Sequence, residues 1–270
     1  MPSWACGCGD SVKEISPPAV LAPFVDRFWY RAAGDPEESA GPTRVLPDGC
    51  LDIVLGPRGA IVVGAMTRPI MVPPAAGSGL LGVRFRPGMA TAFLAVPAAA
   101  LTDDSAPLEA IWPDGAAVAD YVGSALGADQ AMRRLAETLI ARLPRTAAMP
   151  ADLVAAVEQI TAHGGRIDIS RLSATLGVTR QHLARRFAAH VGITPKMLCR
   201  VVRLWQVLRC ATSEPVNWAV LAADLGYSDQ SHLVSEFRSL TGLTPGRWIA
   251  GRGTEAGSKS SSRRPRPALL

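Results

Sequence analysis

Apolar and polar residues follow two different spacings along this chain, and the change between the two divides the sequence. Between about residues 43 and 86, short runs such as LDIVL and LLGVRF alternate with turn signals such as PDG and GPRG. Such runs predict short β-strands, and several in succession predict a small antiparallel sheet or barrel. From about residue 88 to 143, apolar residues recur three and four positions apart, which predicts helices. The apolar residues 17–30 are expected to dock on this first domain.

The chain continues with helical spacing from about residue 150 to 250. The segment PRTAAMP, at 144–150, has a proline at each end and predicts a linker. The C-terminal segment is polar, basic and proline-containing, which predicts disorder. We therefore expect an α+β chain with a small antiparallel β domain and helices at 1–145, an all-α domain at 150–250 and a disordered basic tail at 253–270.

The all-α region contains an internal repeat in which residues 172–195 align with residues 221–245. Each copy has the pattern helix, glycine-containing turn, helix, which is a helix-turn-helix. The second copy has one extra residue in its turn. Residues 194–211 between the copies are expected to form one long helix that sets their separation. The matched pairs are Leu172/Leu221, Leu176/Leu225, Gly177/Gly226, His182/His232, Leu183/Leu233, Phe187/Phe237, Gly192/Gly242 and Pro195/Pro245.

The second helix of each copy is expected to expose a polar face, because its Leu/Phe pair, spaced by four residues, points inward. An α-helix fits the DNA major groove, where arginine pairs with guanine and glutamine with adenine. Two linked readers of this kind could enter successive grooves roughly 34 Å apart. The predicted base readers are Arg180, Gln181, Arg185, Gln230, Ser231, His232 and Ser235, and the predicted phosphate contacts are Arg186, Arg203 and Arg238.

Charge is distributed unevenly along the chain. Residues 1–150 carry a net charge of −3, whereas residues 151–252 carry +5 and the tail carries +3. A basic helical part beside a weakly acidic domain is typical of a polyanion-binding module with a separate domain attached. The sequence has neither a secretory signal at its start nor an apolar run of the ~18 residues that span a bilayer, so the cytoplasm is the expected compartment.

Candidate chemistry in the first domain is sparse. Asp52, Arg84 and Arg86 are polar residues in the β region, and Arg84 and Arg86 are two positions apart and so share a strand face. They could form a structural ion pair or contact an anionic ligand. All four histidines follow residue 150, so a histidine–carboxylate metal site is not expected here. We expect no catalytic residues, no metal and no cofactor.

The five cysteines do not form a disulfide framework, because their number is odd and their positions are scattered. Cys50, Cys199 and Cys210 are expected to be packed. Cys6 and Cys8 support an alternative function, a cysteine-based alkyl acceptor or a metal or redox sensor fused to a DNA-binding domain. A further alternative is a helical interaction scaffold that binds DNA only through non-specific charge.

Three stretches, ISRLSATLGVTRQHLARRFAAHVGITP, RVVRLWQVL and LAADLGYSDQSHLVSEFRSLTGLTPGRW, resemble the DNA-binding domain of the AraC/XylS family of bacterial transcription regulators. The resemblance covers about residues 150–250 and implies base reading by residues 180–185 and 229–235. The chain departs from the family pattern at GRW, where a tyrosine–arginine pair is usual, and at Ser235, where a basic residue often lies.

The N-terminal stretches RVLPDGCLDIVL and LLGVRFRPGMA look like a sensor domain that often precedes this module. The resemblance implies a cupin-like β fold. It implies double-stranded DNA, RNA polymerase, an unidentified small-molecule effector and a second copy of the chain as partners. Activation and repression of transcription are both compatible with it.

Overall fold

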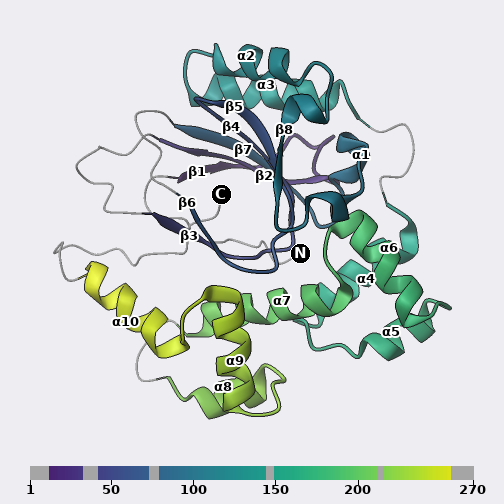
Figure 1. The fold of residues 1–270 in the computed structure, drawn as a ribbon, viewed down its shortest axis with the longest axis vertical. Helices are drawn as coiled ribbons and strands as arrows, with labels where there is room; N and C mark the ends of the chain where they lie inside the picture. Colours follow the sequence, from purple (N-terminus) through teal and green to yellow (C-terminus); the bar gives the residue numbers. More distant parts are fainter. Residues whose placement is uncertain (1–11, 33–41, 73–78, 144–148, 212–215, 257–270) are drawn as a thin grey trace.

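The computed structural model describes residues 12–32, 42–72, 79–143, 149–211 and 216–256. It has an antiparallel β domain followed by a helical part, and the two lie against each other (Figure 1). The predicted α+β order is therefore confirmed. Among the described residues, none of the helices combines the length and hydrophobicity that crossing a bilayer requires.

The β domain is built on a six-stranded sheet with the order β1-β2-β7-β4-β5-β8, and β3 and β6 form a separate pair. All of the strand pairs are antiparallel. The strands are β1 (Val12–Ile15), β2 (Val25–Arg31), β3 (Thr43–Val45), β4 (Asp52–Gly56), β5 (Gly59–Val63), β6 (Ile70–Val72), β7 (Leu80–Phe85) and β8 (Ser105–Pro107).

Two strands of this domain were not predicted. Residues 17–30 lie against the first domain as expected, but residues 25–31 do so as a strand of its sheet, β2, which pairs with β1 and β7. Val25, Phe28 and Trp29 are buried there, so this run has the composition of a strand buried on both faces. The second is β8, a strand at Ser105–Pro107 that lies inside the region predicted to be helical.

Helices cover one face of the sheet and build the rest of the chain (Figure 1). Helices α2 and α3 pack on the face from which Ile53, Val83 and Phe85 point into the main core. The helices are α1 (Thr91–Leu94), α2 (Gly115–Gly123), α3 (Ala128–Ile140), α4 (Ala151–Ala162), α5 (Ile169–Thr175), α6 (Arg180–Val191), α7 (Pro195–Cys210), α8 (Trp218–Asp224), α9 (Gln230–Thr241) and α10 (Pro245–Ala256), with 3₁₀ turns η1 (Ala98–Leu101) and η2 (Leu108–Ala110).

The predicted repeat is present in three dimensions. Helices α5 and α6 form the first copy, α8 and α9 form the second, and the second turn holds one more residue than the first. Gly177 and Gly226 adopt φ of +67° and +72°, a conformation that favours glycine. Thr179 caps α6 and Asp229 caps α9 by accepting a hydrogen bond from a backbone N–H group of the first turn.

Helix α7 joins the two copies, which lie toward its opposite ends (Figure 1). It begins at Pro195, which suits the first helical position because it has no N–H group to leave unpaired. Ten of its side chains are buried. Nine of them, all except Pro195, belong to one continuous apolar cluster that extends from the sheet to α9, so the β domain and the helical part share a core.

Polar contacts also join the β domain to the helical part. The indole Nε1 of Trp205 on α7 donates to the carbonyl of Pro47, 2.9 Å away. Thr102 donates its hydroxyl to the carbonyl of Gly192, directly after α6. Arg44 Nη1 donates to the carbonyl of Thr241, at the end of α9, over 3.0 Å. The β domain therefore holds the carboxyl ends of α6 and α9 as well as the middle of α7.

We predict that Trp205→Phe lowers the free energy of unfolding by about 1–3 kcal/mol, because the buried carbonyl of Pro47 loses its donor and the phenyl ring fills less of the buried site than the indole. Chemical denaturation of the full chain measures the change. Tyr121→Phe is the control, because it removes a hydroxyl from an exposed ring and should stay within about 0.5 kcal/mol of the wild type. Equal stability of the Trp205→Phe variant and the wild type would refute an anchoring role for this bond.

The C-terminal end differs slightly from the expectation. Helix α10 continues to Ala256, so the first residues of the segment predicted as a tail at 253–270 are helical. Residues 257–270 lie outside the described residues, as do Cys6 and Cys8.

Candidate nucleic-acid interface

Helix α6 exposes the face that the sequence predicts to read DNA. Leu183 and Phe187 are fully buried, which turns the opposite side of the helix outward. Arg180, Gln181 and Arg185 are all exposed on that side. The Nη2 atom of Arg185 lies 3.2 Å from Nδ1 of His182, one turn earlier, so the guanidinium rests along the helix surface.

An open groove of about 550 Å³ lies beside this face. The amino ends of α5, α6 and α7 line it, and Arg180 and Gln181 contribute their side chains. Lys196, in the first turn of α7, adds an exposed ammonium to the same groove. Helix amino ends carry partial positive charge, so the groove suits a phosphate group of a nucleic acid. Sequence reasoning missed Lys196, although a lysine directly after Pro195 is a signal for this position.

Helix α9 presents the corresponding face of the second copy. Leu233 and Phe237 are buried, whereas the predicted readers Gln230, Ser231 and Ser235 are exposed. These three side chains line an open groove of about 670 Å³. Both predicted reading faces therefore border a hollow of the surface. The remaining lining residues of this second groove are Val234, Arg238, Ser239 and Thr244.

His232 is exposed on α9 but is held locally. Its Nδ1 lies 3.1 Å from the hydroxyl of Ser228, and its ring stands edge-on to Tyr227. The backbone N–H of His232 donates to the Asp229 carboxylate over 2.8 Å. This bond, together with the Ser228 hydroxyl, holds the pKa of Asp229 below its usual value. The start of α9 is thus fixed by its cap, as the start of α6 is fixed by Thr179.

The three predicted phosphate contacts have different environments. Arg238 is exposed and borders the second groove. Arg186 instead pairs with Asp152 of α4, with 2.9 Å between its Nη2 and Oδ1. Arg203 pairs with Glu236 of α9 through its Nε and Nη2 atoms. Burial alone would lower the pKa of Arg203, but the bonds to Glu236 outweigh it and raise this pKa.

In the β domain, the structure brings two of the three predicted ligand residues together. Arg84 donates to Asp52 through Nε and Nη2 at 3.0 and 2.8 Å, and both side chains are buried. These residues are cross-strand partners on β7 and β4, and the observed contact is the structural ion pair. Asp48 adds a second carboxylate, 2.9 Å from Arg84 Nη1. Arg86 lies beyond β7 and donates to the carbonyl of Ala22 instead.

The PDG sequence is therefore more than a turn. Gly49 has a φ of +78°, and Asp48 accepts the backbone N–H of Cys50 while it pairs with Arg84. Burial raises the pKa of the Cys50 thiol well above its usual value, so this cysteine stays protonated.

Cys199 is buried as expected, but Cys210 is exposed in the last turn of α7, so the expectation of packing was wrong there. Within the described ranges, no three metal-binding side chains form a cluster.

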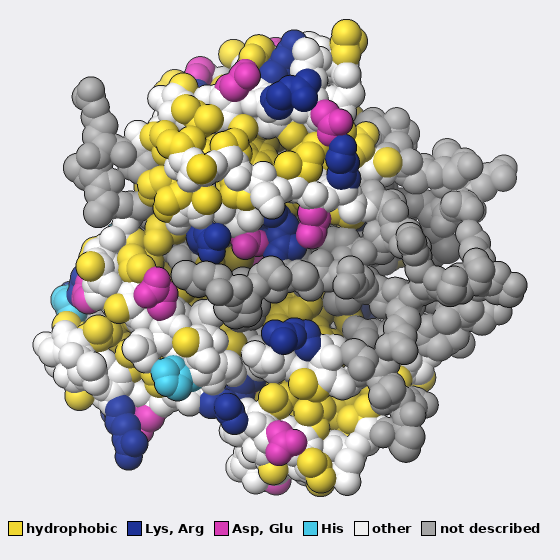
Figure 2. Space-filling model, turned by 180° about the vertical axis from the view of Figure 1, so that it is seen from behind, with side chains coloured by type: hydrophobic (Ala, Val, Ile, Leu, Met, Phe, Trp, Pro, Cys, Tyr) yellow, Lys and Arg dark blue, Asp and Glu magenta, His cyan; other side chains and the backbone are white. Residues whose placement is uncertain are grey.

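Figure 2 shows how charge is arranged on one face of the molecule. Lys and Arg side chains lie over both the β domain and the helical part, with Asp and Glu between them. Hydrophobic side chains gather mainly over the β domain on this face. Among the described residues on this face, the basic side chains form no continuous patch, so DNA binding is inferred from individual basic and polar residues on α6, α7 and α9.

Two families match separate parts of the chain. Residues 13–107 match a family described as "Domain of unknown function (DUF6597)", and residues 172–251 match one described as "Helix-turn-helix domain". No curated protein matches the chain.

Several solved structures are similar at low identity. The C-terminal domain of AraT, a response regulator from Geobacillus stearothermophilus, is 19% identical, with a TM-score of 0.36 and coverage of 38% of this chain and 88% of that one. The DNA-binding domain of AdpA, solved with a target DNA, is 21% identical, with a TM-score of 0.36 and coverage of 41% and 100%. ToxT from Vibrio cholerae is 7% identical, with a TM-score of 0.41 and coverage of 89% and 98%.

The assignment rests on the helix-turn-helix match, which covers both copies of the repeat with their glycine corners and capped second helices. Residues 172–251 are therefore a helix-turn-helix domain, as the repeat in the sequence predicts.

Proposed function

We propose that the chain binds an asymmetric site in double-stranded DNA by placing α6 and α9 in successive major grooves. The observation that carries this proposal is the repeat itself: two helices with buried Leu/Phe pairs expose equivalent polar faces, and each face borders an open groove. A rigid helix, α7, joins the two units. Readers held in this way suit half-sites about one helical turn apart.

The two helices have different chemistry and so different roles. Helix α6 offers Arg185 and Gln181, which suit bidentate contacts with guanine and adenine. Arg180 is a third reader on this helix. Helix α9 is the weaker reader, because Gln230, Ser231, His232 and Ser235 include no arginine or lysine. Arg238 and Lys196 are the proposed phosphate contacts, whereas Arg186 and Arg203 are engaged in ion pairs within the protein.

A salt titration tests the DNA-binding proposal. Binding to a duplex enriched from a random library should be at least ~10³-fold tighter than binding to a scrambled duplex at physiological salt. The logarithm of both affinities should fall linearly with the logarithm of the salt concentration. A chain that enriches no sequence, while still binding DNA at low salt, would be the helical scaffold instead.

We further propose that a signal in the β domain modulates DNA binding. Effector binding, a second copy of the chain or RNA polymerase could supply that signal. The support is the position of the contacts from Thr102 and Arg44, which hold the carboxyl ends of α6 and α9 and leave their amino ends exposed. The Trp205→Phe variant should then change DNA affinity as well as stability. If the DNA affinity of that variant is unchanged, the contact between Trp205 and the β domain does not modulate DNA binding, and this proposal is contradicted.

A further inference from the structure

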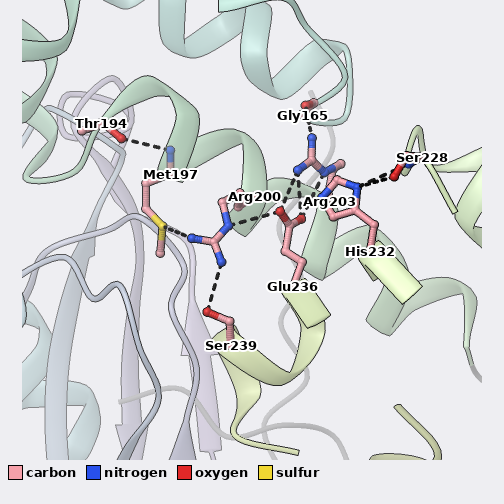
Figure 3. Close-up of polar contacts among 9 residues, drawn as sticks. All are labelled: Gly165, Thr194, Met197, Arg200, Arg203, Ser228, His232, Glu236 and Ser239. Carbon is pink, nitrogen blue, oxygen red and sulfur yellow. Dashed lines mark hydrogen bonds and ion pairs between the residues drawn. The ribbon is translucent and has the colours of Figure 1, made fainter. Parts of the chain in front are cut away.

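One carboxylate on the second reading helix is bound by two arginines of α7 (Figure 3). Glu236 lies in the middle of α9 and is only 6% exposed, although the neighbouring Ser235 is exposed. It accepts a hydrogen bond from Nε of Arg200 at 3.1 Å. It also accepts bonds from Nε of Arg203 at 3.2 Å and from its Nη2 at 2.9 and 2.8 Å.

The two arginines extend this connection beyond Glu236. Nη2 of Arg200 donates to the Ser239 hydroxyl, 3.1 Å away and one turn further along α9. The Arg203 guanidinium stands 5.0 Å from the ring centre of Tyr227, which lies in the turn between α8 and α9. Because guanidinium–carboxylate bonds are directional, contacts at several points along α9 restrict its rotation and its slide relative to α7.

The equivalent position in the first copy has an ion pair of the opposite polarity. Aligning Phe187 of α6 with Phe237 of α9 places Arg186 at the position of Glu236, and Arg186 pairs with Asp152 of α4. The second helix of each copy is therefore joined by an ion pair at the same position to another helix, α4 for α6 and α7 for α9. The side chains of the first pair are about a third exposed, whereas the side chains of Glu236 and Arg203 are 5% and 16% exposed, so the second pair is screened less by solvent.

We propose that Glu236 is a positioning residue that sets the separation and angle between the two reading helices, and with them the spacing of the DNA half-sites. The inference rests on the two-helix readout proposed above. Glu236 itself faces α7 rather than the groove that Gln230, Ser231 and Ser235 line, so it acts through the helix that carries these readers.

Selection of binding sites from a random duplex library, with the full chain, tests the proposal. The wild type should select two preferred segments at one fixed separation, and inserting one base pair between them should weaken binding at least about tenfold. Glu236→Gln retains the size of the side chain but loses the charge that both arginines bind. This variant should still select the segment read by α6, but it should accept several separations between the two segments. Its affinity should fall less than about threefold when one base pair is inserted between them.

Two further variants separate positioning from folding and from net charge. Glu158→Gln removes a carboxylate from an exposed position on α4 and should select the wild-type spacing. Arg200→Lys retains the positive charge but loses the fork that bridges Glu236 and Ser239, and should widen the accepted spacing even if Glu236→Gln does not fold.

The outcomes distinguish the two claims. If the wild type selects only one segment, the two-helix readout fails and the role of Glu236 fails with it. If the wild type selects two segments and Glu236→Gln or Arg200→Lys, folded, selects them at the same fixed separation with the same insertion penalty, the positioning role alone is overturned.

Discussion

Arg84→Ala should lower the free energy of unfolding by about 3–5 kcal/mol, the largest effect that we expect from a single substitution in this chain. Arg84 is buried between Asp52 and Asp48, and its removal leaves these two carboxylates without its guanidinium at a site shielded from solvent. Denaturant unfolding of the full chain at neutral pH measures this loss. Arg58→Ala, at an exposed position between β4 and β5, is the matched control and should change stability by less than about 0.5 kcal/mol.

The loss of unfolding free energy in Arg84→Ala, called the deficit below, should depend on pH because the carboxylate of Asp52 is charged at high pH and neutral at low pH. Burial raises the pKa of Asp52 to about 6 in the wild type, although Arg84 opposes this rise. Without Arg84 the pKa rises further, so ionising this carboxylate in the folded state costs more than in the wild type, and the extra cost begins above the wild-type pKa of about 6. Below the unfolded value of about 4 both states are protonated. The deficit should therefore shrink as the pH falls from 7 to 4, and a constant deficit would mean that lost packing, not charge, causes it.

Arg185→Ala should weaken binding to the selected DNA site by about 1–3 kcal/mol and relax the base preference at one position. Arg185 is exposed on α6 and has the guanidinium geometry that recognises guanine. Competition binding against duplexes substituted at each position measures both effects. Affinity for random DNA should fall much less, because only a base contact is lost.

Arg238→Ala is the matched comparison in the second copy, because it removes the same side chain from the border of the second groove. Because Arg238 is the proposed phosphate contact, Arg238→Ala should weaken binding to every DNA sequence alike and reduce the slope of the salt dependence by about one. The assignment of the reading face is wrong if Arg185→Ala leaves both affinity and base preference unchanged.

Sequence patterns predicted the helical part well because its signals are local. The Leu183/Phe187 pair of α6 recurs with the same spacing as Leu233/Phe237 of α9, and both pairs are buried. The glycine at the corner of the first copy also recurs in the second. The β domain was predicted less completely. Strand β2 was missed because its sequence, VDRFWYR, mixes charged and aromatic residues, and because its pairing partner β7 follows only after β3, β4, β5 and β6 in the chain.

In the candidate site, too, the sequence predicted local features but not contacts between residues far apart in the chain. The exposure of Gln181, Arg185 and Gln230 follows from helix periodicity, so periodicity sufficed to predict it. The ion pairs of Arg186 and Arg203 do not follow from periodicity, because Asp152 and Glu236 lie 34 and 33 residues away. An arginine on a half-exposed helix position looks the same in sequence whether it binds a phosphate or a carboxylate of its own chain.

Guanine methylation interference on the selected DNA site tests the central claim most directly, because a methyl group at N7 blocks contacts in the major groove. The two-helix account predicts two clusters of interfering positions on one face of the duplex, about one helical turn apart. Arg185→Ala should remove interference from the cluster under α6 and leave the other. A single cluster in the wild type, or two clusters on opposite faces of the duplex, would contradict it.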